Sequence, residues 1–224
     1  MSHSVEVTHP RSTPLSRLLS STPEKKVTPL DAFRLARNHW LAGERLDIGK
    51  IASELGVGRA TVFRWVGTRE NLYAEICSQL FKKTLEQAEA QAKGRGVDKL
   101  IDILEHLLRT LAHAAPLRYF VEQDPEFALR VLTSRASTVQ FRCVQHMREL
   151  IFALVDAPAL PADELAYIIV RITESFLYRD VLTGDAADIE AAIRAIRVLL
   201  TAPPSVNTRA PRTPARAGTR APSR

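Results

Sequence analysis

Cysteine is scarce in this 224-residue sequence, and the two present form no recognisable site. Cys77 and Cys143 lie far apart and belong to no Cys-x-x-Cys pair. A disulfide framework or a structural zinc site needs more cysteines at closer spacing, so neither is expected. The scarcity of cysteine fits a protein of the reducing cytoplasm.

Long apolar runs are also missing. No run reaches the roughly 18 to 20 residues that cross a bilayer, and the first 27 residues hold no apolar stretch of signal-peptide length. We therefore expect a cytoplasmic protein that makes no membrane contact.

Motifs of catalysis are absent too. There is no Gly-x-Ser-x-Gly and no phosphate-binding loop. Asp102, His106 and His113 share one helical stretch and could bind a metal, but no fourth ligand or water-activating glutamate pattern accompanies them. The sequence thus favours a non-enzyme with no metal and no cofactor, although a helical enzyme stays as an alternative.

What the sequence does have is positive charge, and it is unevenly placed. The net charge is +6, and the Pro- and Arg-rich segment from residue 203 onward carries five arginines and no acid. We predict a disordered leader over 1–27 and a disordered basic tail over 203–224. Residues 28–83 hold nine basic and six acidic side chains, and residues 84–202 hold thirteen and seventeen. A basic front suits contact with an anionic polymer.

Helix signals begin at Thr28-Pro29-Leu30-Asp31, where a threonine cap precedes a proline at the first helical position. Apolar residues then recur at helical spacing until Gly43. Asp47 starts a second helix, which Gly56 closes, and a third helix is expected over Arg59–Trp65. Two short helices joined by a tight turn predict a helix-turn-helix.

The third helix has one face for packing and one for reading DNA. We expect four side chains to pack inward, namely Ala60, Val62, Phe63 and Val66. Arg59, Thr61, Arg64 and Trp65 remain outside, and arginine reads guanine in the major groove. Trp65 could instead seal the junction with the next helix.

Thr68 begins the next helix, whose first N–H groups and positive dipole end form an anion site that Arg69 could extend to a phosphate. The predicted DNA-binding residues are Thr28, Lys50, Arg59, Thr61, Arg64, Trp65, Thr68 and Arg69.

The rest of the chain reads as helices with no convincing strand, over 97–114, 126–135, 139–155, 161–182 and 185–200, with a short "LRYFV" segment between the first two. At helical spacing Tyr167, Arg171, Glu174 and Tyr178 form a polar stripe. This stripe is either a buried network at a dimer seam or pocket wall, or a partly exposed stripe with an ordinary ion pair. The last two helices offer apolar faces for a homodimer.

The segments "IGKIASELGVGRATVFRWV" and "GTRENLYAEI" resemble the DNA-binding domain of TetR-type transcriptional regulators. Three residues depart from the pattern of many members: Gly58 replaces Ser or Thr, Phe63 replaces Tyr, and Arg69 replaces Lys. "DPEFALRVLTSR", "VQFRCV" and "RITESFLYRDVLTG" further resemble the QsdR-type branch. That resemblance implies a lactone-like or fatty-acyl effector.

The predicted fold class is all-α. A three-helix helix-turn-helix domain over 28–80 precedes a helical ligand-binding and dimerisation bundle over 81–202.

The predicted function is a ligand-responsive regulator, expected to be a repressor. It would bind a palindromic double-stranded DNA operator as a homodimer, and a small hydrophobic effector would release it. The alternative is a constitutive architectural DNA-binding protein without an effector. The expected effector cavity is formed by Leu104, Leu107, Leu108, Tyr119, Phe120, Phe141, Val144 and Met147, with Tyr119 or Tyr178 orienting the polar head.

Overall fold

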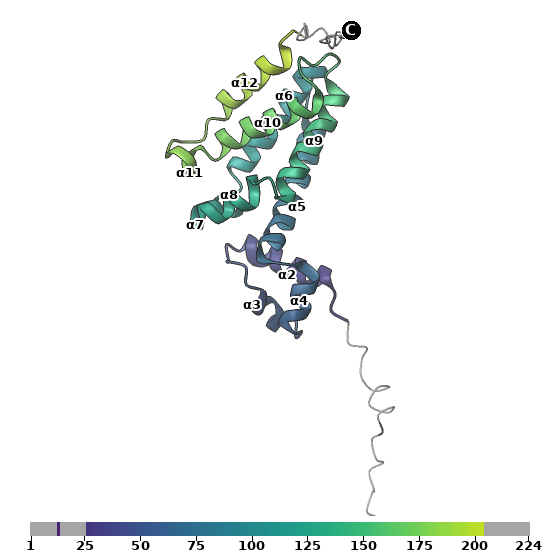
Figure 1. Ribbon diagram of the computed structural model, residues 1–224, viewed down its shortest axis with the longest axis vertical. Helices are drawn as coiled ribbons and strands as arrows, with labels where there is room; N and C mark the ends of the chain where they lie inside the picture. Colours follow the sequence, from purple (N-terminus) through teal and green to yellow (C-terminus); the bar gives the residue numbers. More distant parts are fainter. Residues whose placement is uncertain (1–12, 14–25, 204–224) are drawn as a thin grey trace, which may run out of the picture.

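The computed structural model describes residue 13 and residues 26–203, and all regular structure in this part of the chain is helical (Figure 1). The predicted leader and tail lie almost wholly outside the described residues. A small group formed by α2 (Pro29–Leu41), α3 (Ile48–Glu54) and α4 (Arg59–Val66) occupies one end of the molecule. A larger bundle occupies the other end. The prediction of an all-α, two-part architecture is confirmed.

The small group forms around side chains that the sequence marks as apolar at helical spacing. Ala32, Ala36 and Trp40 of α2 are buried, as are Ile51 of α3 and Val62 of α4. The caps that set the start of the first two helices are present. Thr28 and Asp31 form a reciprocal capping box on α2, and the Asp47 side chain accepts the Lys50 N–H of α3.

The turn between α3 and α4 has the geometry of a helix that ends in a left-handed residue. Gly56 has a φ of 66°, as its position after Leu55 predicts. Its N–H donates to the Ser53 carbonyl, and the Val57 N–H reaches back to the Ala52 carbonyl, at 3.1 and 3.0 Å. This is the Schellman pattern, and it aims α4 across α2 and α3.

The helix α5 (Arg69–Gln91) joins the two parts of the molecule. Gly67 ends α4 with a φ of 72°, and Thr68 and Asn71 then form a capping box that starts α5. The helix continues through 23 residues, which at 1.5 Å per residue is roughly 35 Å. The domain boundary predicted at 80–81 therefore falls inside one continuous helix.

The larger bundle is built on α5 together with seven further helices. Their bounds are α6 (Gly96–Ala112), α7 (Ala115–Gln123), α8 (Pro125–Thr133), α9 (Thr138–Leu154), α10 (Ala162–Leu177), α11 (Arg179–Thr183) and α12 (Ile189–Thr201). Helices α6, α9, α10 and α12 lie alongside one another in Figure 1. Their fully buried side chains are aliphatic, including Leu100, Leu104, Ile151, Leu165, Ile169 and Ile196. Hydrophobic burial of these side chains holds the bundle together.

Two sequence predictions in this bundle are wrong. The single helix expected over 161–182 is broken at Tyr178, where φ is −103° and ψ is 22°, and α11 follows as a separate short helix. The last helix, expected over 185–200, begins at Ile189 and is capped by Asp188. Asp185 instead pairs with Arg179 at 2.9 Å, so its carboxylate is engaged before α12 begins.

Candidate DNA-binding and effector sites

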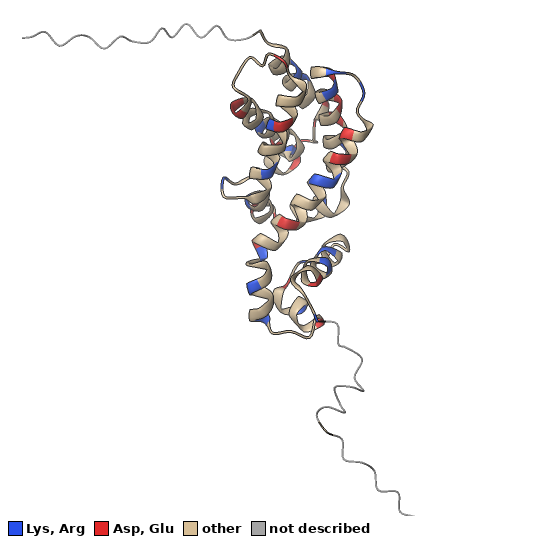
Figure 2. Cartoon of the chain, turned by 90° about the vertical axis from the view of Figure 1, so that its right-hand side faces the viewer, with Lys and Arg blue, Asp and Glu red and all other residues tan. Residues whose placement is uncertain are grey.

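The outer surface of α4 carries the side chains best placed to reach DNA. Arg59 and Arg64 are exposed, and Thr61 is half-buried. Arg64 Nη2 lies 3.5 Å from Thr61 Oγ1, a weak contact that leaves most of the guanidinium's donors available. Figure 2 shows basic residues along the helices at this end of the molecule. The face thus has the donors that guanine O6 and N7 require.

The inward face of α4 is narrower than predicted. Only Val62 is buried, whereas Ala60 is exposed and Phe63 is 53% exposed. The expectation that both pack inward is wrong, because an eight-residue helix lying on two neighbours buries only one thin stripe. Trp65 is half-buried and packs against the core.

Two of the predicted DNA-binding residues, Thr28 and Thr68, form helix caps. The Thr28 hydroxyl lies 2.6 Å from Asp31 Oδ2, and the Thr68 hydroxyl lies 2.7 Å from Asn71 Oδ1. Both threonines thereby cap helices, although their exposed positions leave each near the surface of the small domain.

Lys50 belongs to an ionic network on the small domain. Its Nζ lies 2.7 Å from Glu44 Oε2, and this bond raises the pKa of Lys50. His39 bridges Glu44 and Glu54 at 2.6 and 3.0 Å. Burial lowers the pKa of His39, but the two carboxylates outweigh burial, so the pKa is raised. Lys50 is exposed, but its ion pair with Glu44 already neutralises part of its charge.

Arg69, predicted to extend the anion site at the start of α5 to a phosphate, contacts the bundle. Its guanidinium sits over the Phe127 ring of α8, with Cζ 4.4 Å from the ring centroid. It shares a crevice with Trp40, Tyr73 and Asp124, where the small domain meets the bundle. A cation over an aromatic face is favourable, so Arg69 is held toward the bundle. This position favours a role between the two domains over the predicted phosphate contact.

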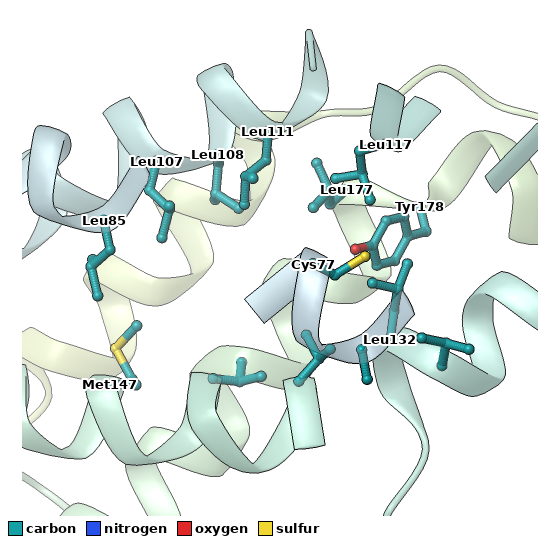
Figure 3. Packing of buried hydrophobic residues seen from close by; sticks show 14 of the residues in the cluster. Cys77, Leu85, Leu107, Leu108, Leu111, Leu117, Leu132, Met147, Leu177 and Tyr178 are labelled. Atoms are coloured by element: carbon teal, nitrogen blue, oxygen red, sulfur yellow. The ribbon is translucent and has the colours of Figure 1, made fainter. Parts of the chain in front are cut away.

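The larger bundle contains a mainly apolar cavity whose wall draws on α5 to α10. Within this cavity, the centres of water molecules can occupy a volume of about 70 Å³. Figure 3 shows side chains of α6 facing Met147 of α9, with Cys77 and Tyr178 at one end. The wall is formed by Cys77, Leu80, Phe81, Leu104, Leu107, Leu108, Leu111, Leu117, Leu132, Val139, Cys143, Met147, Val170, Thr173, Glu174, Leu177 and Tyr178.

Five of the residues predicted for an effector cavity line this one, namely Leu104, Leu107, Leu108, Met147 and Tyr178. Tyr119, Phe120, Phe141 and Val144 do not. Phe141 is 62% exposed and Tyr119 is 44% exposed, because both lie on the outer faces of their helices. Phe120 turns toward the small domain and stacks on Tyr73, with ring centroids 4.4 Å apart. Val144 is half-buried in α9 beside Cys143, which takes the cavity position.

The polar groups of the wall come mainly from α10. Glu174 Oε2 accepts from Arg171 Nη1 at 2.8 Å, and the Glu174 side chain is only 14% exposed. Burial raises the pKa of Glu174 to about 7, although Arg171 opposes the shift. Burial also raises the pKa of Tyr178 and of the thiols of Cys77 and Cys143, so these three groups stay protonated at neutral pH.

The residues of the polar stripe predicted from the sequence therefore differ in how deeply they are buried. Tyr167 is 53% exposed, whereas Glu174 and Tyr178 face the cavity. Sequence reasoning missed Leu117 and Leu132, since nothing in a linear pattern shows that α7 and α8 each turn one leucine toward α6. Cys77 and Cys143 carry a weak signal, because each lies among apolar residues at helical spacing.

The candidate metal ligands of α6 do not gather into a site. His106 Nδ1 bonds the Asp102 carbonyl at 2.8 Å, and His113 Nδ1 bonds the Arg109 carbonyl at 2.7 Å. Over residues 26–203 no group of three His, Cys, Asp or Glu side chains could hold a metal ion. No helix in the same range has the length and apolar character that a membrane span needs.

Comparison with known proteins agrees with this architecture. Residues 95–201 match the family model described as "Tetracyclin repressor-like, C-terminal domain". The solved structure of the TetR-family transcriptional repressor QsdR from R. erythropolis is 28% identical, with a TM-score of 0.72 over 77% of this chain and 93% of that one. The multidrug binding protein EbrR complexed with imidazole is 20% identical over 78% of this chain and 88% of that one, with a TM-score of 0.46. No curated protein gives a significant match.

Proposed function

The chain is a member of the TetR family of DNA-binding transcriptional regulators, and from this premise we propose that it is a repressor released from a palindromic operator by a small, largely apolar effector. The DNA-reading group consists of Arg59, Thr61 and Arg64 on α4, where two exposed arginines flank a threonine. Lys50, Thr28 and Thr68 lie around it and would position the helix on the sugar-phosphate backbone.

The observation that carries the proposal is the cavity beside α5. Cys77, Leu80 and Phe81 of α5 form part of its wall, and the same helix begins at Arg69, directly after the DNA-reading helix. A ligand that widens this small cavity moves the wall, and α5 transmits the shift to the small domain. Because the ligand would bind the widened state more tightly, it would shift the population toward that state.

The helix α7 gives a second route from the cavity to the small domain. Leu117 lines the cavity, and Phe120, one turn further along, stacks on Tyr73. The Tyr73 hydroxyl accepts the Leu46 N–H at 3.0 Å, between α2 and α3. A displaced α7 would therefore act on the loop that positions the helix-turn-helix.

The protein is proposed to act in the cytoplasm as a homodimer that joins through α10 and α12. Tyr167 of α10 and Val198 of α12 are exposed apolar side chains on these helices, 53% and 68% exposed. A two-fold dimer would place two copies of α4 about 34 Å apart or a multiple of that distance, and would therefore bind a palindromic site. A lactone or fatty-acyl effector, as the sequence resemblance implies, gives the first compounds to assay.

The rival function, a constitutive architectural DNA-binding protein, needs no cavity and no release. Selection of bound DNA from a random pool, followed by footprinting, separates the two. The proposal predicts two symmetric protected half-sites and a sedimenting dimer. A cognate ligand at a hundred times its dissociation constant would add about 2.7 kcal/mol of stability and loosen the DNA. Scattered protection with no symmetric site, or a monomer that binds DNA alone, would contradict it.

A further inference from the structure

The cavity wall carries charge at a single place. Of the side chains that line it within the described part of the chain, Glu174 is the only one that carries a charge near neutral pH. Among the described residues, no lysine, arginine or histidine lines the cavity. The remaining polar groups are the Tyr178 and Thr173 hydroxyls and two thiols, and Thr173 Oγ1 already donates to the Val170 carbonyl at 2.7 Å.

The two oxygens of Glu174 are in different situations. Oε2 accepts from Arg171 Nη1, and the same nitrogen also donates to the Thr133 carbonyl at 3.0 Å. Arg171 is 44% exposed, so this partner approaches from the solvent side. Among the described residues no donor reaches Oε1. Because Glu174 lines the cavity, this nearly buried carboxyl keeps one oxygen available to a ligand there.

Tyr178 lies one helical turn after Glu174 and faces the same cavity. It is 9% exposed, and no side chain or backbone group in residues 26–203 forms a hydrogen bond with its hydroxyl. Two polar groups one turn apart on the wall of one cavity match a ligand head with a donor. The apolar remainder of the wall fits a hydrocarbon body.

We propose that the cavity binds an amphiphilic amine, whose positively charged nitrogen donates to Glu174 Oε1 while its alkyl body lies among the leucines of α6. This inference rests on the proposed function, because it takes the cavity to be the effector site. A buried carboxylate binds a cation strongly where water is excluded. Arg171 keeps Oε2, so each oxygen of Glu174 has its own donor.

A carboxylate head is disfavoured by the same residues. It would lie beside Glu174 with no cation directed into the cavity, and burying a charge without a partner is costly. A neutral alcohol or amide head avoids this repulsion and can donate one hydrogen bond, so it ranks between the amine and the carboxylate.

The test compares octylamine, 1-octanol and octanoate by calorimetric titration of the full-length protein at pH 7.5. We expect octylamine to bind at least about tenfold more tightly than octanoate, a difference of about 1.4 kcal/mol. Glu174→Gln should weaken octylamine about tenfold and leave octanol nearly unchanged. Glu164→Gln, at an exposed position on the same helix, is the matched control and should change neither.

The pH dependence gives a second readout. Besides Arg171, the ionisable groups facing Glu174 are Cys77 of α5, Cys143 of α9 and Tyr178 between α10 and α11, all neutral in this range. Because the pKa of Glu174 is about 7, octylamine should bind more tightly at pH 8 than at pH 6. The Glu174→Gln variant should lose this dependence.

Each outcome has a separate meaning. Octanoate binding as tightly as octylamine, or an amine affinity that Glu174→Gln leaves intact, overturns the amine assignment while the cavity remains an effector site. Failure of all three compounds to bind overturns the assignment as well. Octylamine that binds in the expected order but never releases operator DNA supports the assignment and contradicts the proposed regulatory function.

Discussion

Two arginines five positions apart illustrate how surroundings decide the role of a residue. Arg64 is exposed on α4 and has only a weak contact with Thr61. Arg69 lies over Phe127 of α8. The sequence predicts that both residues contact DNA, but of the two only Arg64 projects from the outer surface of the small domain.

Arg64→Ala should therefore weaken operator binding by roughly 1 to 3 kcal/mol and relax one base position. Arg69→Ala should leave the salt dependence of DNA binding nearly unchanged, because no phosphate contact is lost. Fluorescence anisotropy over a salt series measures both effects. A salt slope that falls by about one unit in Arg69→Ala would restore the phosphate contact predicted from the sequence.

Glu174 should make the free energy of unfolding depend on pH. Its pKa rises from an ordinary 4.5 to about 7 on folding, mainly through burial. The folded chain thus binds more protons than the unfolded chain between these values, so stability falls as pH rises through this window. Glu174→Gln removes the titration, and the variant should gain melting temperature relative to the wild type between pH 4.5 and 7.5. An offset that does not change with pH would show that Glu174 ionises normally.

At the scale of the element, the junction from α4 to α5 depends on a glycine. Gly67 has a φ of 72°, and a Cβ there would lie 2.7 Å from Asn71 Oδ1, the acceptor of the α5 capping box. Gly56 has a similar φ of 66°, but a Cβ there meets nothing within 4 Å.

Alanine at a positive φ should cost at least about 1 to 2 kcal/mol in either variant. Gly67 also has a ψ of −141°, which lies outside the left-handed helical region. Gly67→Ala should cost more, since it also displaces Asn71 from the cap. Chemical denaturation measures the difference, with Gly56→Ala as the matched control. Equal losses in the two variants would mean that the cap adjusts without cost.

The helix α7 is proposed to couple the cavity to the small domain through Phe120. Phe120→Leu should keep a side chain of similar polarity but lose the 4.4 Å stack on Tyr73. We expect ligand and DNA each to bind nearly as in the wild type, while the ligand releases DNA less effectively. A parallel titration of operator affinity with and without ligand measures this coupling. Unchanged coupling would leave α5 as the sole route.

The helices that the sequence predicted well are those with strong local signals. Thr28 and Asp47 cap α2 and α3, and Gly56 closes the turn, because capping and left-handed glycine geometry depend on neighbouring residues alone. The break at Tyr178 was not predictable in this way. It occurs where a buried aromatic side chain meets the core, within a continuous apolar pattern.

At the scale of the whole molecule, the sequence indicated an apolar cavity but not its full wall. The α6 leucines share a strong helical period, so their common face was predictable. Which residues of α7, α8 and α9 meet that face depends on how the helices cross. Consequently Phe120 and Phe141 were expected in a cavity that they do not line. The polar stripe with Glu174 was visible in the sequence, but the pattern alone did not distinguish a pocket wall from a dimer seam or an exposed stripe.

Occupation of this cavity is proposed to weaken DNA binding. The most direct test measures operator affinity against ligand concentration for the wild type and for Leu108→Trp, which fills the cavity. Phe141→Trp, on the exposed face of α9, is the control. We expect ligand to raise the operator dissociation constant at least about tenfold in the wild type and the control, equivalent to about 1.4 kcal/mol, and to have little effect in Leu108→Trp. Equal release from all three proteins, or release from none, would contradict it.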